Sequence, residues 1–492
     1  EASRALRTGY VAAFSVPATF PRVRIEVLRY SWSALGGPDR AELRALGDEA
    51  GLAELAASLR APLVIWNALG MPAWCGYLAS SRVLKGRLSL ETRLESLANR
   101  VRAWYRPSSP SLEWAGRLVP TPWADDLRSQ ALFGVKEAQI VLNEASLDQA
   151  GQARDAFLRT HTQPRGQQGW HAAQTKAGGE ARLTAEGWWH SLAWRSYEQL
   201  AGLEGNDAPA SGWMMNGVPQ AQILRQTFTT RGGVETWKAS RLGLRAHPAG
   251  SPADNLVVEV RGSTGSLLAS SSLVGGQLPR QGWVELPLSP EVTIDPGTIY
   301  EVRVLRSGAP EAANAYRVEL DRAATRSDGQ LTCWDGGSWL PVEGGGSLLF
   351  KLEALEDSLA QVTRILRPEA GGQFLAGFSA PGAAGIPAPL WREGRQTARQ
   401  EAEALLNLGA ASGRRYLANI GSNRLARIWE APLPGEADYT LKPDGTLLDP
   451  HGGAVPPGVG VVGVWMRGEN LPGTGEFIER CAWDEGLGRL VF

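Results

Sequence analysis

The chain has 492 residues, 43% of them hydrophobic, and its 50 basic and 51 acidic side chains give a formal net charge of −1. This length allows two to four domains. Because the net charge is close to zero, it gives no indication of a surface that binds nucleic acid or a membrane. Cys75, Cys333 and Cys481 lie too far apart for a disulfide framework or zinc-ligand spacing, so we expect buried free thiols.

The first part of the chain predicts strands with short helices between them. Gly36-Gly37-Pro38 forces a turn, and residues 51–62 carry an amphipathic helix stopped by Pro62. Residues 89–106 combine a helical spacing of leucines with later alternation, so we expect a short helix that becomes a strand at about Asn99. Strands are predicted at residues 22–30, 63–67 and 73–84.

Residues 146–161 are the clearest helix of the first half. Ser146 and Gln149 form a capping-box pair, and Asp148 lies in the positively polarised first turn. A strand-rich segment follows at residues 178–200, and the loop at residues 205–213 is the expected linker into the next domain.

Residues 220–351 predict a self-contained all-β module. Short alternating apolar runs are broken by turn residues at roughly the eight-to-twelve-residue spacing of a β-sandwich. Leu256, Val258 and Val260 fall on one face of a strand, while the residues between them fall on the other.

After this module the pattern returns to helices and strands. We expect a helix of about twelve residues ended by Pro368, and a second helix with Thr397 as N-cap, Gln400 three residues on and Gly409 at its end. A strand is expected at residues 373–379. The remaining strands are predicted at residues 414–420, 424–433, 437–450, 459–466 and 486–492.

The module at residues 220–351 resembles the jelly-roll modules, many of them carbohydrate-binding-like, that are appended to secreted and surface proteins. The resemblance implies a two-sheet fold and does not by itself imply sugar binding. It rests on the order of the segments QTFTT, HPAGSPADNLVVEV, GWVELPLSPEVTIDPGTIYEVRV and WDGGSWLPVEGGGSLLFKL.

The surrounding segments resemble the tail-tip or baseplate hub proteins of long-tailed, siphovirus-like bacteriophages. The match covers about 350 residues, has no single diagnostic motif, and also includes the later Ala- and Leu-rich helix and the Arg-rich strand pair. It rests on the order of YSWSALGGPDRAEL, PLVIWNALGMPAWCGYLASS, SLETRLESLANRVRAWYR, TPWADDLRSQALFGVKE and ARLTAEGWWHSLAWRSY.

We therefore expect a mainly β, multi-domain α+β fold of small barrel-like hub domains with an inserted jelly-roll sandwich. Insertion into a surface loop with close ends costs little stability. The expected divisions are a β domain at residues 1–110, the first part of an α+β domain at 111–215, the inserted sandwich at 216–353, and the remaining hub domains at 354–492, ending in a barrel-like segment.

Two candidate sites lie in the predicted sandwich. Trp334 and Trp339 flank a hairpin turn, where an indole is able to stack on the apolar face of a sugar ring; packing at the rim of the sandwich is the alternative. Asp254 and Asn255 are candidate ligands for a structural calcium ion, although an Asp-Asn pair also suits an ordinary turn. No other metal site or cofactor is expected.

Arginines on predicted strands of the hub part are candidates to face a channel for DNA: Arg100, Arg102, Arg106, Arg424 and Arg427. The alternative is an ordinary solvent-facing or Glu-paired strand face. No Gly-x-Ser-x-Gly elbow, paired histidines or phosphate-binding loop is present, so we predict no enzyme.

The resemblance implies a structural virion protein that closes the tail tube as a homotrimer and lets phage DNA pass. Expected partners are the tube, distal-tail, tape-measure and tip proteins, and a host-surface glycan for the outward module. The protein would be made in the host cytoplasm and reside in the virion. The bias of basic residues toward arginine fits a GC-rich, thermophilic source.

The alternative is a secreted or surface carbohydrate-binding protein, as a part of a polysaccharide-active enzyme or on its own. The start of the sequence lacks the apolar core of a signal peptide, and no acid/base pair stands out, which favours the hub. No run has the length of a membrane span, so we expect a soluble protein.

Overall fold

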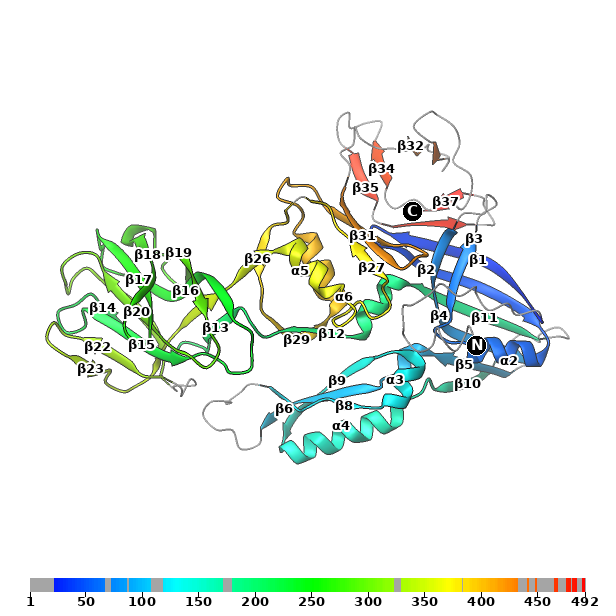
Figure 1. Cartoon of the computed structure of the whole chain (residues 1–492), viewed down its shortest axis with the longest axis horizontal. Coiled ribbons are helices and arrows are strands. Elements are labelled where there is room, and N and C mark those ends of the chain that lie inside the picture. The colour runs from blue at the N-terminus through cyan, green and yellow to red at the C-terminus, as the bar shows by residue number, and fades with distance from the viewer. Residues whose placement is uncertain are drawn as a thin grey trace.

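The computed structural model describes residues 22–66, 72–85, 88–107, 118–170, 179–322, 329–382 and 384–431, and beyond residue 431 only the backbone of short strands. The side chain of Cys481 and much of the predicted C-terminal strand region therefore lie outside the described residues. The fold is mainly β with a few helices, as predicted. A sandwich forms one end of an elongated molecule, and a body with a small subdomain beside it forms the other (Figure 1).

The body is built on a twelve-stranded sheet with the main order β10-β5-β4-β11-β2-β1-β36-β37. β30 joins this sheet by lying parallel to β2, and β31 and β27 continue from β30. The strands are β1 Val23–Ser33, β2 Leu35–Gly47, β3 Pro62–Trp66, β4 Pro72–Lys85, β5 Leu88–Arg93, β10 Gly166–Trp170, β11 Glu180–Gly187, β27 Gly377–Ser379, β30 Tyr416–Ile420, β31 Leu425–Glu430, β36 Arg480–Asp484 and β37 Arg489–Val491.

An aromatic core holds the helices of the body against this sheet. The helical elements are α2 Glu49–Ala57, η1 Leu94–Ser96, η3 Trp188–Trp194, α5 Ser358–Ile365 and α6 Ala398–Asn407. The predicted capping box of Thr397 and Gln400 is present at the start of α6. The large aromatic side chains buried in this core include Trp74, Tyr77, Trp188, Trp189, Trp194 and Phe374.

Two glycines let the tight turn near residue 36 lie against the tryptophan-rich segment η3. Gly36 has a φ of +115°, and a Cβ atom there would lie 2.5 Å from Cγ of Trp189. A Cβ atom on Gly187 would lie 1.6 Å from the carbonyl oxygen of Pro38. Neither position has room for a side chain, so two segments far apart in the sequence form one junction.

The small subdomain is an α/β unit, here called the α4 subdomain. β6 is its central strand, β9 lies parallel to it, and α4 packs on both. The capping box predicted for Ser146 and Gln149 is present at the start of α4. The elements are β6 Arg100–Pro107, β7 Val119–Pro120, β8 Ala124–Asp125, α3 Leu127–Phe133, β9 Glu137–Ala145 and α4 Leu147–His161.

The sandwich has two layers with one continuous apolar core. The distal sheet has the order β18-β17-β20-β15-β22-β23 and lies toward the end of the molecule farthest from the body (Figure 1). The proximal sheet contains β13-β25-β16-β19, with β21, β14 and β24 attached through β16. A short 3-10 turn, η4 Gly275–Gln277, links β18 to β19.

The strands of the sandwich are β13 Leu203–Asn206, β14 Gly212–Asn216, β15 Ile223–Thr229, β16 Trp237–Ala249, β17 Asn255–Gly262, β18 Leu267–Val274, β19 Trp283–Ile294, β20 Ile299–Arg306, β21 Ala315–Asp321, β22 Leu331–Trp334, β23 Trp339–Pro341, β24 Ser347–Leu348 and β25 Phe350–Glu353.

The chain enters and leaves the sandwich through neighbouring strands. β13 pairs antiparallel with β25, which places Leu203 opposite Glu353. On the body side, β12 Ser196–Gln199 pairs with β29 Arg392–Thr397, and β26 Leu355–Asp357 pairs with β28 Pro387–Pro389. The sandwich is thus connected to the body by two adjacent crossings.

Two predicted boundaries differ from the structure. Residues 88–93 form strand β5, not a helix, because they pair with β4 on one side and β10 on the other. The segment at residues 205–213, predicted as a linker, overlaps β13 and β14, which pair with β25 and β21 of the sandwich. The first strand of the sandwich therefore starts at Leu203 instead of near residue 216.

Candidate ligand-binding face of the sandwich

The outer face of the distal sheet carries three arginines in the middle of the sheet. Alternation along β15 turns Leu224, Gln226 and Phe228 into the core, so Arg225 between them points outward. The strand register then sets Arg225 directly opposite Arg303 on β20. On the next strand, β17, Arg261 lies opposite Glu301. We call this surface the distal face.

Two carboxylates partly neutralise these arginines. Glu301 accepts hydrogen bonds from Nε and Nη2 of Arg303 at 3.0 and 2.8 Å, and lies 3.9 Å from Nη1 of Arg225. Glu259 accepts a hydrogen bond of 2.7 Å from Nε of Arg261. Arg225 donates its Nε hydrogen to Thr332 at 3.0 Å. Three guanidinium groups thus share two carboxylates on the described part of this face.

The two tryptophans predicted as a glycan site lie at the edge of the same face. Their ring centres are 5.6 Å apart with an angle of 54° between the planes. The guanidinium carbon of Arg225 lies 4.1 Å from the centre of the Trp339 ring, and that of Arg303 lies 5.3 Å from it. These distances are those of cation–π contacts, so Trp339 holds both arginines in place.

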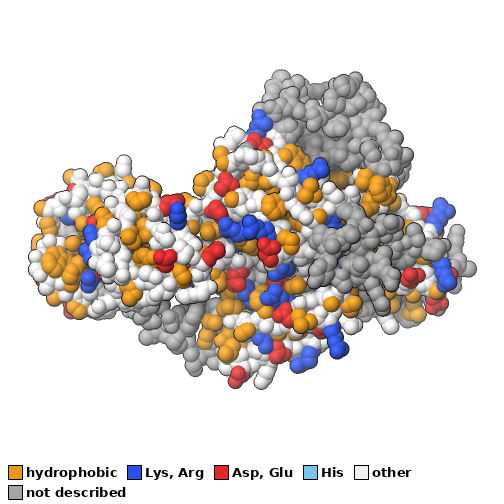
Figure 2. All heavy atoms as spheres, viewed as in Figure 1, with side chains coloured by type: hydrophobic (Ala, Val, Ile, Leu, Met, Phe, Trp, Pro, Cys, Tyr) orange, Lys and Arg blue, Asp and Glu red, His pale blue; other side chains and the backbone are white. Residues whose placement is uncertain are grey.

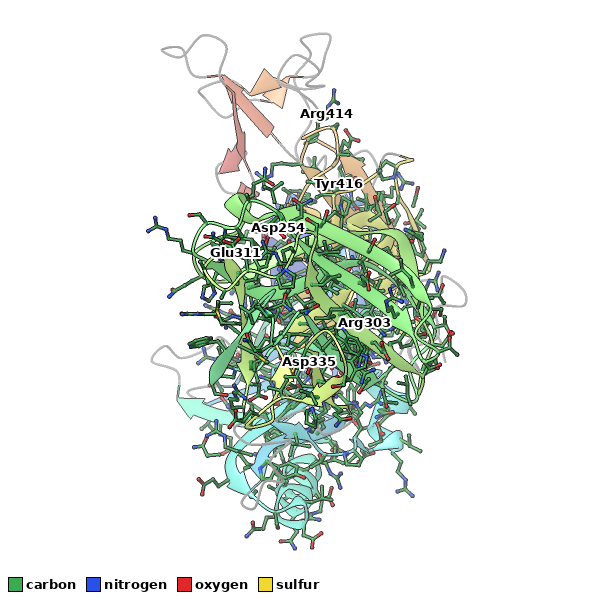
Figure 3. The ribbon with its side chains drawn as sticks, turned by 90° about the vertical axis from the view of Figure 1, so that its left-hand side faces the viewer. Asp254, Arg303, Glu311, Asp335, Arg414 and Tyr416 are labelled. Atoms are coloured by element: carbon green, nitrogen blue, oxygen red, sulfur yellow. The ribbon has the colours of Figure 1, made fainter. Side chains whose placement is uncertain are left out.

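The turn between β22 and β23 fixes the position of both tryptophans. Asp335 accepts hydrogen bonds from the backbone N–H groups of Gly337 and Ser338, each at 2.8 Å. These N–H groups favour the ionised form and lower the pKa of the Asp335 carboxyl. Figure 3, which views the molecule from the sandwich end, labels Asp335 and Arg303 on this part of the sandwich.

Asp254 forms a structural contact in the sandwich, at the position suggested for calcium. Its two carboxylate oxygens each accept a 2.7 Å hydrogen bond from Arg306, and Oδ2 also accepts one from the N–H of Gly308. Burial opposes its ionisation, but these hydrogen bonds outweigh burial and lower its pKa. Within the described residues no cluster of His, Cys, Asp or Glu suits a metal ion.

Two of the arginines proposed to face a channel, both on β6, are engaged with partners within the chain. Arg102 is only 3% exposed, donates to the carbonyl of Gly394, and lies between the rings of Trp104 and Trp123. Arg100 lies within 3.6 Å of carboxylates on both Asp125 and Glu137. Gly394 of β29 covers Arg102, so Arg102 is not on a surface that DNA can reach.

The other proposed channel arginines differ in exposure. Arg424 has its guanidinium 4.5 Å from the centre of the Trp188 ring, and burial lowers its pKa. Arg427 and Arg106 are exposed. The structure therefore does not bring these five arginines to one surface.

A cavity of about 560 Å³ lies where the α4 subdomain meets η1 and β10 of the body. Lys136 reaches into this junction, where its ammonium group donates to the carbonyl oxygens of Leu94 and Glu95 and lies 5.5 Å from the centre of the Trp194 ring. Burial lowers the pKa of Lys136 to about 8, although Glu186 and Glu95 oppose the change.

Sequence reasoning found Trp334 and Trp339 but missed Arg225, Arg261 and Arg303. The alternation in residues 256–261 was visible, but only the order of strands in the sheet brings β15, β17 and β20 together. No described helix is both long enough and apolar enough to cross a membrane.

Comparison with family models and with curated proteins finds no match. One similar solved structure is the functional form of the mosquito-larvicidal Cry4Aa toxin from Bacillus thuringiensis, with 7% identity and a TM-score of 0.18 over 62% of this chain and 52% of the toxin chain. Another is a glycoside hydrolase family 43 arabinoxylan arabinofuranohydrolase from Bacillus subtilis in complex with cellotetraose, with 9% identity and a TM-score of 0.14 over 57% and 63%. The chain spans less than two thirds of either, and likenesses this weak carry no inference about its fold or function.

Proposed function

We propose that the chain is a structural protein of a phage tail tip, a baseplate hub that assembles as a homotrimer, closes the tail tube and admits DNA afterwards. Its inserted sandwich would project outward to contact the host surface or brace neighbouring tip proteins. The observation that carries this proposal is the two-part architecture: a sandwich connected to a mixed body by two adjacent chain crossings and pointing away from it (Figure 1).

Three of the five segments that resemble hub proteins come together in the body, and the other two lie mainly in the α4 subdomain. The turn at Gly36 packs on Trp189, Gly187 packs on Pro38, and Trp74 belongs to the same core. These three motifs, which were matched only by their order along the chain, are thus neighbours in space. This supports a body architecture shared with hub proteins.

The body also offers an edge for a neighbouring subunit. Among the described strands β10 pairs with β5 alone, so its other edge has backbone groups available to a partner strand. On β5 beside it, Leu88 is 54% exposed and Leu90 is 46% exposed. An open strand edge next to exposed apolar side chains suits contact with a second copy of the chain in a closed ring.

Surface charge is compatible with a conduit that does not retain DNA. Figure 2 shows acidic and basic side chains interspersed over the described surface in that view, without one large block of a single sign. Strong phosphate binding needs clustered basic side chains. DNA would therefore pass such a surface without strong attraction.

The test is the native mass of the purified protein, measured by light scattering over a concentration series. We expect a trimer, and we expect the double variant Leu88→Lys, Leu90→Lys to shift it toward monomer because charge is introduced beside the open edge. Leu267→Lys on β18 is the matched control, since Leu267 is an exposed leucine on the sandwich. A wild-type monomer at every concentration would contradict the hub proposal.

A second candidate function is a secreted or surface carbohydrate-binding protein. The pair of tryptophans at the edge of the distal face favours it, because aromatic rings beside polar side chains suit saccharide recognition. This function needs only the sandwich. A monomeric chain that binds saccharide would favour it over the hub.

A further inference from the structure

We propose that the distal face binds an acidic saccharide, with its carboxylate or phosphate group held between Arg225 and Arg303 and its ring against Trp334. This deepens the proposed outward role of the sandwich and rests on it for biological context. The binding itself depends only on the side chains of the distal sheet.

The first support is an excess of positive charge on the distal face, where two arginines lie side by side. Arg225 and Arg303 lie directly opposite each other on neighbouring strands, an arrangement that is unfavourable without a counter-ion. Glu301 is the carboxylate beside both, and it is bound to Arg303 through two hydrogen bonds while staying 3.9 Å from Arg225. Glu259 lies opposite Arg303 on β17, but it accepts its hydrogen bond from Arg261. Three arginines therefore face two carboxylates, and a bound anion would supply a third negative charge.

The second support is the number of donors left over. Arg225 uses Nε for Thr332, and Arg303 uses Nε and Nη2 for Glu301. The remaining guanidinium N–H groups of both residues have no hydrogen-bond acceptor among the described residues. Planar guanidinium groups with free N–H pairs bind carboxylate and phosphate oxygens with good geometry.

The third support is the division of roles between the two tryptophans. Trp339 already carries both guanidinium groups on its ring, so it orients the arginines. Within the described residues no cation lies over the Trp334 ring. This side chain is half-buried, and its ring centre lies 5.6 Å from that of Trp339. Its ring is therefore the one available to a sugar. Together the features select a ligand that combines a ring with an anionic group.

On the opposite sheet, two central arginines have close carboxylate partners. Arg241 lies within 2.6 Å of both Glu285 and Glu353, and Arg245 lies 2.8 Å from Glu319. Arg317 stacks 4.0 Å over Trp213 on that sheet, in the same manner as Arg225 on Trp339. Arg317 therefore provides a matched control for a stacked arginine outside the distal face.

The experiment is isothermal titration calorimetry on the full chain with three probes: an oligogalacturonate, a phosphorylated mannan oligosaccharide, and neutral maltohexaose. We expect one or both acidic probes to bind and maltohexaose not to bind. If only the oligogalacturonate binds, the ligand group is a carboxylate. If only the phosphorylated mannan oligosaccharide binds, it is a phosphate. Arg225→Gln and Arg303→Gln should each weaken binding about tenfold to a hundredfold. Arg317→Gln should bind like the wild type.

Two further variants separate the proposal from nonspecific attraction of a polyanion. Trp334→Ala should weaken binding although it removes no charge, and Arg225→Lys should recover only part of the affinity lost in Arg225→Gln, because lysine lacks the planar donor pair. No binding of either acidic probe, equal binding of maltohexaose, or unchanged binding by Arg225→Gln and Arg303→Gln would overturn the proposal. Light scattering on the same samples reports assembly separately, so a monomer that binds would contradict the hub and retain this inference.

Discussion

Lys136 allows a direct test of the junction between the body and the α4 subdomain. Its ammonium group is held by the carbonyls of Leu94 and Glu95, and burial lowers its pKa from 10.5 to about 8. The native state therefore releases the Lys136 proton at a lower pH than the unfolded chain does. Replacing Lys136 by methionine removes this titration while keeping a long apolar side chain.

The sign and size of the effect follow from proton linkage. Between pH 8 and 10.5 the unfolded chain binds more protons at Lys136 than the native chain, so the free energy of unfolding should rise with pH through this window. A full shift of this size is equivalent to about 3 kcal/mol. Because the side chain is partly exposed and screened by water, we expect about 1–3 kcal/mol.

The assay is urea unfolding followed by tryptophan fluorescence, from pH 7 to pH 10.5. Burial raises the pKa of Cys75 to about 12 and also raises that of Tyr77, which lowers stability as the pH rises and opposes the Lys136 effect. The quantity to compare is therefore the free energy of unfolding of the wild type minus that of Lys136→Met. This difference should rise with pH. A flat or falling difference would refute the reasoning, and Lys238→Met, at an exposed lysine, controls for loss of one lysine.

Three further predictions concern the fold. Gly36→Ala should lower the free energy of unfolding by about 3 kcal/mol or more, because it adds a clash to a left-handed backbone, whereas Gly232→Ala, in open space, should change it by less than about 0.5 kcal/mol; thermal melts would check both. Asp254→Ala should lower the free energy of unfolding by about 3 kcal/mol, because it leaves the buried Arg306 without its carboxylate partner. EDTA should leave the melting temperature of the wild type unchanged. A lower melting temperature in EDTA would restore the calcium hypothesis. Since the pKa of Asp254 is lowered, its contribution is present above pH 3.8 and lost as the pH falls through the lowered pKa, which acid titration of the variant and the wild type would show. Deletion of residues 203–353 with a short Gly-Ser linker should leave a folded body by circular dichroism, because the ends meet at β13 and β25, and an unfolded product would contradict the insertion.

Local signals in the sequence were sufficient for several elements. The capping boxes at Ser146 and Thr397 specify helix starts through side chains within three residues, and both helices are present. The alternation of Leu256, Val258 and Val260 identifies a strand buried on one face, and all three are fully buried. Such features depend on nearby residues, so a sequence reveals them without knowledge of the tertiary structure.

Features set by distant partners were not predictable in the same way. The leucine spacing at residues 90–97 suits a helix, but pairing with β4 and β10 outweighs that local preference. The alternation of Arg100 and Arg102 suggested an open strand face, yet Gly394, almost 300 positions later, covers Arg102. The distal face likewise needs the order of its strands before Arg225 and Arg303 become neighbours.

The paired entry and exit strands have a mechanical consequence. A pull on the free end of the sandwich would reach the body through both crossings at once, because β13 and β25 leave the same end of the sandwich side by side. The force would be divided between the two chain segments that connect the sandwich to the body. One strand would not be pulled from the sheet by itself. A double connection of this kind would transmit the direction of an applied force as well as its magnitude. A single flexible linker would not transmit the direction.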